Sequence, residues 1–397
     1  MSDKSYERRS KEDIPILAIC YDFDKTLSPD DMQAQGFIQS IDYDPQDFWE
    51  KTNSCAEKNN MDQNLSWMYH MMYLAGGKVP FSRKRLTKYG SEVKLFPGVD
   101  TWFERINSFG REHNVKVEHY VISSGLKEMI EGTEIAQRGV FEKIYASSFF
   151  YDEREVAIWP AQVVNYTNKT QFLFRIEKGV LDINDSGVND YFPPESVRVP
   201  FRNIVYIGDS DTDVPCMKLV NSLGGHSIGV FDSKTGDKEK VYKMMDNQRI
   251  RYFAPADYSE NTELERLVKD IILKTCENEK LEEKYAECKK EAKQQRYPRN
   301  EKEQELANKK TELINSLITS RSFAMTHTII RQLNTVEKWN NEQRELLCKA
   351  TCNPQVDFVL MDEDVCAFFT KIVSETKAKT PYIERVRKDL GISSSGE

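Results

Sequence analysis

Residues 14–27 read IPILAICYDFDKTL, an apolar run that turns acidic within a few residues. The run is nearly continuous, as in a strand that is buried on both faces of a parallel sheet. Two carboxylates, Asp22 and Asp24, follow directly where this strand is expected to end. Ligands of open α/β sheets bind at the carboxyl ends of the strands. We therefore expect Asp22 to face a cleft and Asp24 to reach into it from the following turn.

Similar apolar runs alternate with helical patterns further along the chain. Strands are expected over residues 115–124, 143–150, 203–208 and 226–231. Helices are expected over residues 98–114, 127–137, 170–176, 217–223 and 262–273. Strands that alternate with helices predict an α/β fold with a Rossmann-like parallel sheet.

The pattern becomes helical and polar between the first strand and the second, with expected helices at Asp47–Lys58 and Leu65–Leu74. A loop of this length without secondary structure is improbable, so the segment is predicted to be a small helical subdomain inserted after the first strand. The predicted organisation is a polar N-terminal tail (1–13), an α/β core (14–32 and 97–275), this helical insertion (33–96), a charged helical connector (276–310) and a small helical C-terminal module (311–397).

The connector is rich in charge and carries a thin apolar stripe at helical spacing, formed by Leu281, Tyr285, Cys288 and Ala292. Pro298 is expected to interrupt it, and a second helix is expected over Gln304–Leu333. A stripe of this kind indicates a solvated helix, with a coiled-coil partner surface as the alternative.

The composition excludes several classes of protein. The 397 residues carry a formal net charge of −8, which argues against a dedicated nucleic-acid-binding protein. The apolar run Ile16–Tyr21 is too short to cross a bilayer, and residues 1–13 contain no signal-peptide core, so a cytoplasmic protein without a membrane partner is expected. The eight cysteines lack a CxxC pair, and the isolated Cys348 and Cys352 predict neither a zinc site nor a disulfide framework.

Two further motifs follow expected strands, VISSG at residues 121–125 and GDSDTD at residues 208–213. The ends of parallel strands meet at one edge of a sheet, so four carboxylates are expected to converge there: Asp22, Asp24, Asp209 and Asp213. Like charges at this proximity repel one another, and a divalent cation relieves the conflict. Hard oxygen ligands with room for water and phosphate favour Mg²⁺.

The set of DFDKT, a serine at a strand end, a lysine and GDSDTD resembles the phosphatase branch of the haloacid dehalogenase superfamily. The resemblance covers about residues 14–275 and includes a helical cap between the first and second motifs. It implies that Asp22 is the nucleophile that forms an aspartyl-phosphate and that Asp24 is the general acid and base. Asp209 and Asp213 would then complete the magnesium site.

The same resemblance assigns the phosphate-binding residues. Ser123 would hydrogen-bond a phosphoryl oxygen, with Ser124 as the alternative, and Thr26 would fix the geometry of the first motif. A lysine must offset the charge of the nucleophile and the phosphate. Lys169 opens an expected helix as the lysine of the family does, and Lys178 is its competitor.

These features predict a Mg²⁺-dependent phosphatase that acts on a small phosphorylated metabolite, in the manner of a phosphoserine phosphatase. A phosphotransferase or mutase with the same intermediate is an alternative. A third hypothesis is a regulatory ligand-binding protein whose residues 276–397 contact a protein partner or a second copy of the chain. In the cap, the basic run at residues 82–88 is expected to be a solvated face, with a patch that steers anions as the alternative. Residues 67–72 are expected to form the core of the cap, with the lining of a substrate pocket as the alternative.

Overall fold

The computed structural model describes residues 6–296, 301–336 and 338–392. The chain forms two compact units that divide between Tyr285 and Ala286. Of the helices in these ranges, none is long and apolar enough to cross a bilayer.

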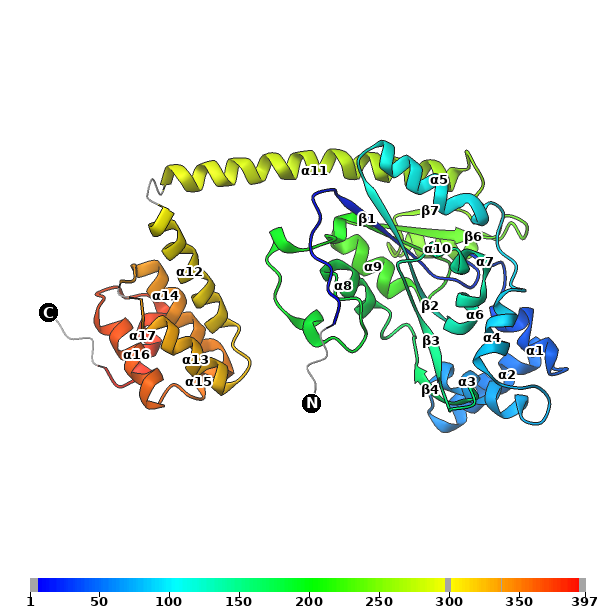
Figure 1. Ribbon diagram of the computed structural model, residues 1–397, viewed down its shortest axis with the longest axis horizontal. Helices are drawn as coiled ribbons and strands as arrows, with labels where there is room; N and C mark the ends of the chain where they lie inside the picture. Colours follow the sequence, from blue (N-terminus) through cyan, green and yellow to red (C-terminus); the bar gives the residue numbers. More distant parts are fainter. Residues whose placement is uncertain (1–5, 297–300, 337, 393–397) are drawn as a thin grey trace. The chain divides into compact units, whose positions relative to one another are not determined.

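The first unit is built on a sheet with the strand order β4-β3-β2-β1-β5-β6-β7 (Figure 1). The strands are β1 (Ile16–Tyr21), β2 (Lys116–Leu126), β3 (Lys143–Tyr151), β4 (Ala157–Gln162), β5 (Ile204–Gly208), β6 (His226–Phe231) and β7 (Tyr252–Pro255). Neighbouring strands run parallel, except for β3 and β4, which are antiparallel. The predicted α/β fold is confirmed, and β4 and β7 are the strands that the sequence pattern did not predict.

Helices cover both faces of this sheet, as the alternating side chains of β1 require. Leu17, Ile19 and Tyr21 pack toward α5 (Val99–Glu112), α6 (Lys127–Gly132) and α11 (Glu263–Arg296). The intervening residues of β1 pack toward α8 (Thr170–Lys178), α9 (Val214–Ser222) and α10 (Glu239–Asp246). Both faces of β1 are therefore buried, which explains its unbroken apolar sequence.

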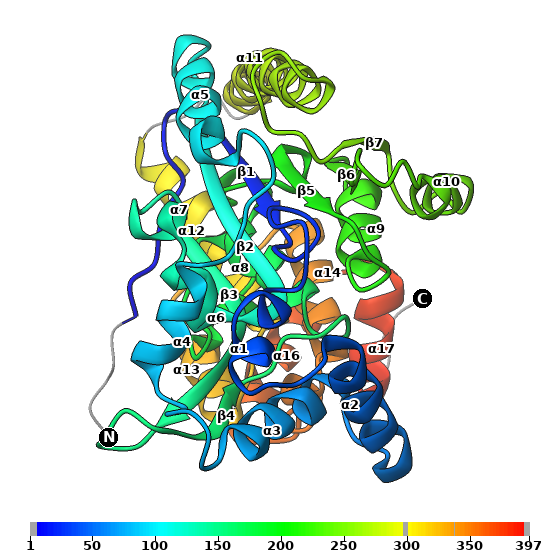
Figure 2. The same ribbon diagram turned by 90° about the vertical axis from the view of Figure 1, so that its right-hand side faces the viewer.

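A group of helices is inserted between β1 and α5, where the cap was predicted. It comprises a 3-10 turn, η1 (Met32–Gln35), followed by α1 (Phe37–Ser40), α2 (Pro45–Asn59), α3 (Gln63–Ala75) and α4 (Arg83–Gly90). Figure 2 shows α3 beside β4, in agreement with the contacts between these two elements. The side chains of Asp44, Asp62 and Ser82 accept hydrogen bonds from the first turns of α2, α3 and α4 and so fix where these helices begin.

The two cap segments singled out in the sequence have mainly structural contacts. Trp67, Met68 and Met71 are buried in the core of the unit. Arg83 forms an ion pair with Glu155 and lies over the ring of Tyr151. Packing within the core therefore explains most of the apolar side chains among residues 67–72, and contacts within the chain explain the position of Arg83 in the basic run, so neither observation requires a ligand.

The remaining elements are short. They are the helix α7 (Glu134–Gln137) and the 3-10 turns Ser186–Asn189, Pro194–Ser196, Phe201–Asn203 and Ala350–Cys352. The break between α6 and α7 at Thr133 divides the single helix predicted over residues 127–137, and the Thr133 side chain caps α7.

Within the predicted N-terminal tail, residues 8–12 are bound to the core by ion pairs, and residues 1–5 lie outside the described residues. Arg8 lies 2.8 Å from Asp185 and Arg9 lies 2.7 Å from Glu142. The carboxylate of Glu12 contacts Lys116 at 2.9 Å and Arg198 at 2.7 Å.

The second unit contains α12 (Glu301–Ile318), α13 (Phe323–Leu333), α14 (Asn341–Lys349), α15 (Pro354–Asp357), α16 (Glu363–Ser374) and α17 (Pro381–Asp389). Its own core includes the buried side chains of Leu317, Leu333, Leu347, Phe369 and Val386. The single helix predicted over Gln304–Leu333 is therefore wrong in part: it ends at Ile318, and α13 restarts where the Ser322 hydroxyl accepts a hydrogen bond from the Met325 amide. Pro298, the predicted interruption, lies outside the described residues.

Glu118 of β2 is a fully buried carboxylate near the amino ends of the strands. Arg198 donates to both of its oxygens, at 2.6 and 2.8 Å, and the Tyr120 hydroxyl donates at 2.6 Å. Burial alone would raise the pKa of Glu118, but the hydrogen bonds from Arg198 and Tyr120 and the charge of Arg198 lower it to about 2. The folded state thus favours the ionised carboxylate over its protonated form.

We expect Glu118→Gln to lower the free energy of unfolding by about 3 kcal/mol at pH 7, as the shift from 4.5 to about 2 implies. Because the folded-state pKa is depressed, this contribution is full above the unfolded value and is lost as the pH falls from about 4.5 toward 2. Urea unfolding of both proteins across this range measures the difference. Exposed Glu112→Gln is the matched control on the neighbouring α5, and a difference between wild type and Glu118→Gln that does not shrink in acid would contradict the assignment.

Candidate functional site

Three aspartates meet at the carboxyl ends of β1 and β5, which are neighbours at the centre of the sheet. The Asp22 amide donates to the Ile207 carbonyl at 2.9 Å, so the chain leaves both strands at the same level. Asp22, Asp209 and Asp213 each offer an oxygen, and these oxygens lie within 4.8 Å of one another. All three residues are buried. The structure therefore brings together three of the four predicted carboxylates.

Lys169 lies between two of these aspartates and is fully buried. Its ammonium nitrogen is 2.7 Å from Asp213 Oδ1 and 3.3 Å from Asp22 Oδ1. The residue precedes α8, as predicted. Lys178, the competitor, is the last residue of α8 and instead donates hydrogen bonds to the carbonyl oxygens of Val188 and Asp190.

Asp213 is held by a complete set of hydrogen bonds. The Tyr206 hydroxyl donates to Oδ1 at 2.8 Å, while the Ser210 amide and hydroxyl donate to Oδ2 at 3.1 and 3.0 Å. A Cβ atom at Gly208 would lie 2.6 Å from the Asp213 carboxylate, so only glycine allows the chain to pass at this distance. The orientation of Asp213 is therefore fixed from several sides.

Asp24 is near this group, but the structure does not place its carboxylate within it. The amides of Thr26, Leu27 and Ser28 all bind the Phe23 carbonyl, so the chain turns tightly after β1. This turn directs the side chain of Asp24 toward η1, where Oδ1 accepts a hydrogen bond from the Met32 amide at 2.8 Å. The side-chain carboxylate of Asp24, which was predicted to be a fourth metal ligand, therefore points away from the other three aspartates.

Ser123 and Ser124 lie near the carboxyl end of β2, and Thr26 lies in the turn after β1. Ser123 is buried, and its oxygen accepts a hydrogen bond from the Gly125 amide at 3.1 Å. The hydroxyl oxygens of Ser124 and Thr26 are buried without a hydrogen-bond partner among the described residues. The Tyr258 hydroxyl donates to the Thr26 carbonyl at 2.9 Å and so supports the turn. Both serines therefore remain candidates for a phosphoryl ligand.

Charge and burial together raise the pKa values of Asp22 and Asp209. Burial, and then the nearby charges of Asp213 and Asp209, raise the pKa of Asp22 to about 7 despite the attraction of Lys169. Burial also raises the pKa of Asp209 to about 6, against the effect of Lys240. For Lys169, burial disfavours the charge, but Asp213 and Asp22 outweigh it and raise its pKa.

The aspartate cluster fits a hard divalent cation. It consists of carboxylate oxygens, and Asp22 Oδ1 is a buried oxygen whose contact with Lys169 is not a hydrogen bond. Protonation removes the negative charge of such oxygens, and a bound cation offsets it; either one relieves their mutual repulsion. Oxygen donors of this type suit Mg²⁺.

Two residues of the site were missed by the sequence analysis. Tyr206, which binds Asp213, reads only as part of a buried strand. Lys240, on the first turn of α10, lies 3.1 Å from Asp209 Oδ2, but its sequence context is an ordinary charged segment. Neither carried a sequence feature that could have indicated its contact.

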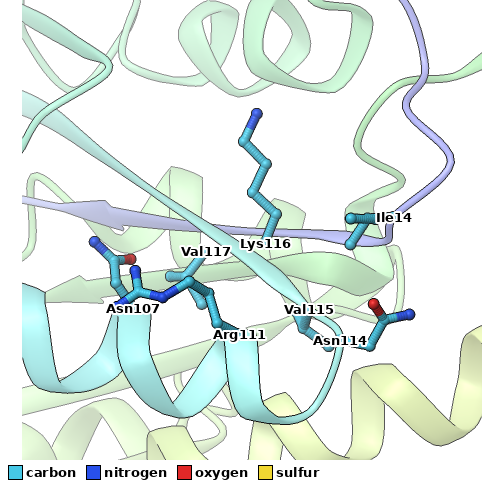
Figure 3. A pocket seen from close by; sticks show the side chains of 7 residues that line it. All are labelled: Ile14, Asn107, Arg111, Asn114, Val115, Lys116 and Val117. Carbon is cyan, nitrogen blue, oxygen red and sulfur yellow. The ribbon is translucent and has the colours of Figure 1, made fainter.

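A cavity of about 370 Å³ lies at the other end of the strands and is separate from the aspartate cluster. Figure 3 shows Asn107 and Arg111 on α5 facing Val117, while the Lys116 side chain points away from Arg111. Lys116 begins β2, whereas Ser123 lies seven residues further along the same strand. This cavity therefore does not contribute to the candidate site.

No family model matches the chain. An uncharacterized protein of Borreliella burgdorferi is 26% identical over 282 residues, in an alignment that covers 65% of this chain and 96% of that protein. Among solved structures, a HAD family hydrolase of Salmonella enterica serovar Typhi is 16% identical with a TM-score of 0.42, and the match covers 61% of this chain and 69% of that one. A probable phosphoserine phosphatase of Vibrio cholerae is 12% identical with a TM-score of 0.43, and the match covers 67% of each chain.

We expect Asp22→Asn to stabilise the metal-free protein by about 4 kcal/mol at pH 8.5, because it removes a carboxylate that is charged above its raised pKa of about 7. A raised pKa makes the ionised group destabilising above the folded value, so the gain should shrink as the pH falls from about 7 toward 3.8. Urea unfolding in the presence of a chelator measures this. Exposed Asp211→Asn is the control, and a destabilised Asp22→Asn protein at pH 8.5 would show that the carboxylates are not in conflict.

Proposed function

We propose that the chain is a Mg²⁺-dependent phosphatase of the haloacid dehalogenase superfamily, which hydrolyses a small phosphorylated metabolite through an aspartyl-phosphate. One observation carries the proposal: Lys169 is fully buried between Asp22 and Asp213 at the carboxyl end of the central strands. A permanently charged lysine beside a nucleophile and a metal ligand is the arrangement that phosphoryl transfer requires.

In this proposal, Asp22, Asp209 and Asp213 hold the cation. The cation would neutralise charge that develops on the transferring phosphoryl group and would offset the repulsion among the carboxylates. The residues of the chain perform every other part of the reaction.

Asp22 is the nucleophile. One of its oxygens attacks phosphorus, the bond from phosphorus to the leaving oxygen breaks, and the phosphoryl group is carried as an acyl phosphate. Lys169 stabilises negative charge on the phosphoryl oxygens from its buried position. Ser123 or Ser124, together with Thr26, would donate hydrogen bonds from their hydroxyl groups to the same oxygens. This role would explain why the buried hydroxyl oxygens of Ser124 and Thr26 have no hydrogen-bond partner among the described residues.

Asp24 is the general acid and base. Burial, and then the charges of Asp31 and Asp22, raise its pKa well above the usual range, which favours the protonated form that a general acid needs. It donates this proton to the leaving oxygen. In the second half of the reaction it takes a proton from water, whose oxygen attacks phosphorus and releases Asp22 with inorganic phosphate. The hydrogen bond from the Met32 amide links Asp24 to the start of the cap.

Hydrolysis of p-nitrophenyl phosphate tests the proposal. We expect release of p-nitrophenol by the wild type with Mg²⁺, loss of release with a chelator, and a fall of at least roughly 10³-fold in Asp22→Asn because the nucleophile is absent. Asp211→Asn is the control, since that side chain is exposed beside the site. Activity that survives in Asp22→Asn would exclude the aspartyl-phosphate route.

Asp24→Asn should separate the two halves of the reaction. The p-nitrophenolate group leaves without much protonation, so the first half should proceed, while hydrolysis of the acyl phosphate should slow by about 10²-fold without a base. Rapid mixing should therefore show a burst of one p-nitrophenol per active site, followed by slow turnover. A uniform slowing without a burst would assign Asp24 no role in the second half.

A further inference from the structure

Three lysines lie at or near the aspartate cluster, and each has a different carboxylate partner. Lys169 is buried between Asp22 and Asp213. Lys25 lies 3.0 Å from Asp31, and Lys240 lies 3.1 Å from Asp209. The three therefore differ in what would happen to them when a cation binds.

We expect Lys169 and Lys25 to keep their positions in that event. Lys169 has no exposed surface and is enclosed by its contacts, so it has nowhere to move. The partner of Lys25 is Asp31, which is not a member of the aspartate cluster. A divalent ion at the cluster therefore leaves both of these lysines in place.

Lys240 differs from Lys25 because its partner, Asp209, is a member of the cluster, and it differs from the buried Lys169 because its side chain can move into solvent. The Lys240 side chain is 46% exposed and extends from the first turn of α10, on a flexible aliphatic stem. A divalent cation on Asp209 would satisfy that carboxylate and repel the ammonium group. Lys240 then carries an unpaired charge at the solvent side of the site.

We propose that Lys240 is the counter-cation of Asp209 that Mg²⁺ displaces, and that the displaced ammonium binds a second anionic group of the substrate. This inference rests on the proposed phosphatase function. It names the substrate class as phosphomonoesters whose leaving group carries a carboxylate or another phosphate.

We assign Lys240 to the leaving group because its side chain is exposed, whereas the phosphoryl group would be met from the buried side. The phosphoryl group would already be met by Lys169 from the buried side, with hydroxyl groups around it. Lys240 approaches from the exposed side, on the segment that follows β6, the neighbour of β5 in the sheet. An ammonium group at this place meets whatever extends from the phosphate toward solvent.

The first half of the test is calorimetric titration of the full chain with Mg²⁺ alone, without substrate. Lys240→Gln should bind Mg²⁺ about threefold more tightly than the wild type, because no ion pair must be broken. Lys243→Gln is the matched control, exposed one turn further along α10. Unchanged or weaker Mg²⁺ binding in Lys240→Gln would overturn the displacement.

The second half uses two ligands that cannot be hydrolysed, 2-carboxyethylphosphonate and the neutral-tailed propylphosphonate, on protein saturated with Mg²⁺. The wild type and Lys243→Gln should prefer the carboxylate-bearing ligand, and this preference should fall about tenfold in Lys240→Gln. Lys240→Arg should restore it, since it keeps the charge. An equal preference in wild type and Lys240→Gln would overturn the assignment of the second anion.

The two proposals can fail separately. Both titrations measure binding, so they report on Lys240 even in a protein that does not turn over. Absence of p-nitrophenyl phosphate hydrolysis by Mg²⁺-loaded wild type would count against the phosphatase function alone.

Discussion

Lys169 is the group that allows the buried carboxylates of Asp22 and Asp213 to lie close together. Its ammonium lies within ion-pair distance of both, at 3.3 and 2.7 Å, in a region without solvent to screen their repulsion. Coulombic interactions are strong in such a setting, and removal of one member of a buried charge set leaves the others uncompensated. The two carboxylates at the ends of β1 and β5 can therefore be buried together only because Lys169, at the start of α8, lies between them.

The rest of the site follows from that requirement. Asp213 is oriented by Tyr206 and Ser210 and by the close passage of Gly208, so its carboxylate cannot turn away from Lys169. Asp22 lacks comparable hydrogen bonds at Oδ1 and remains available to react. If the cluster holds a cation as proposed, the burial that raises the pKa of Asp22 would disfavour the charged cluster without the cation and favour its binding, which is a common conflict between stability and function.

Much of the core could be predicted because its strands are buried on both faces and therefore read as apolar runs. The edge strands could not: β4 contains Pro160 and mostly half-buried or exposed residues, and β7 has only four residues. Asp22 and Asp209 were predictable because each directly follows a strand, and Asp213 was predictable because it belongs to the same acidic motif after β5. The orientation of Asp24 depends on the tight turn at Phe23, and the contact of Lys240 depends on packing between distant segments. The sequence pattern records neither.

The N-terminal segment and β1 are synthesised long before several of the segments that they contact. Arg8 binds Asp185, 177 residues later, and β1 pairs with β2 and β5 from Lys116 and Ile204 onward. At about 5–20 residues per second, the ribosome needs roughly 10–35 s to supply these partners. The ladder on the β2 side of β1 can therefore form well before the ladder on its β5 side, and the central strand of the sheet gains its second neighbour late in synthesis.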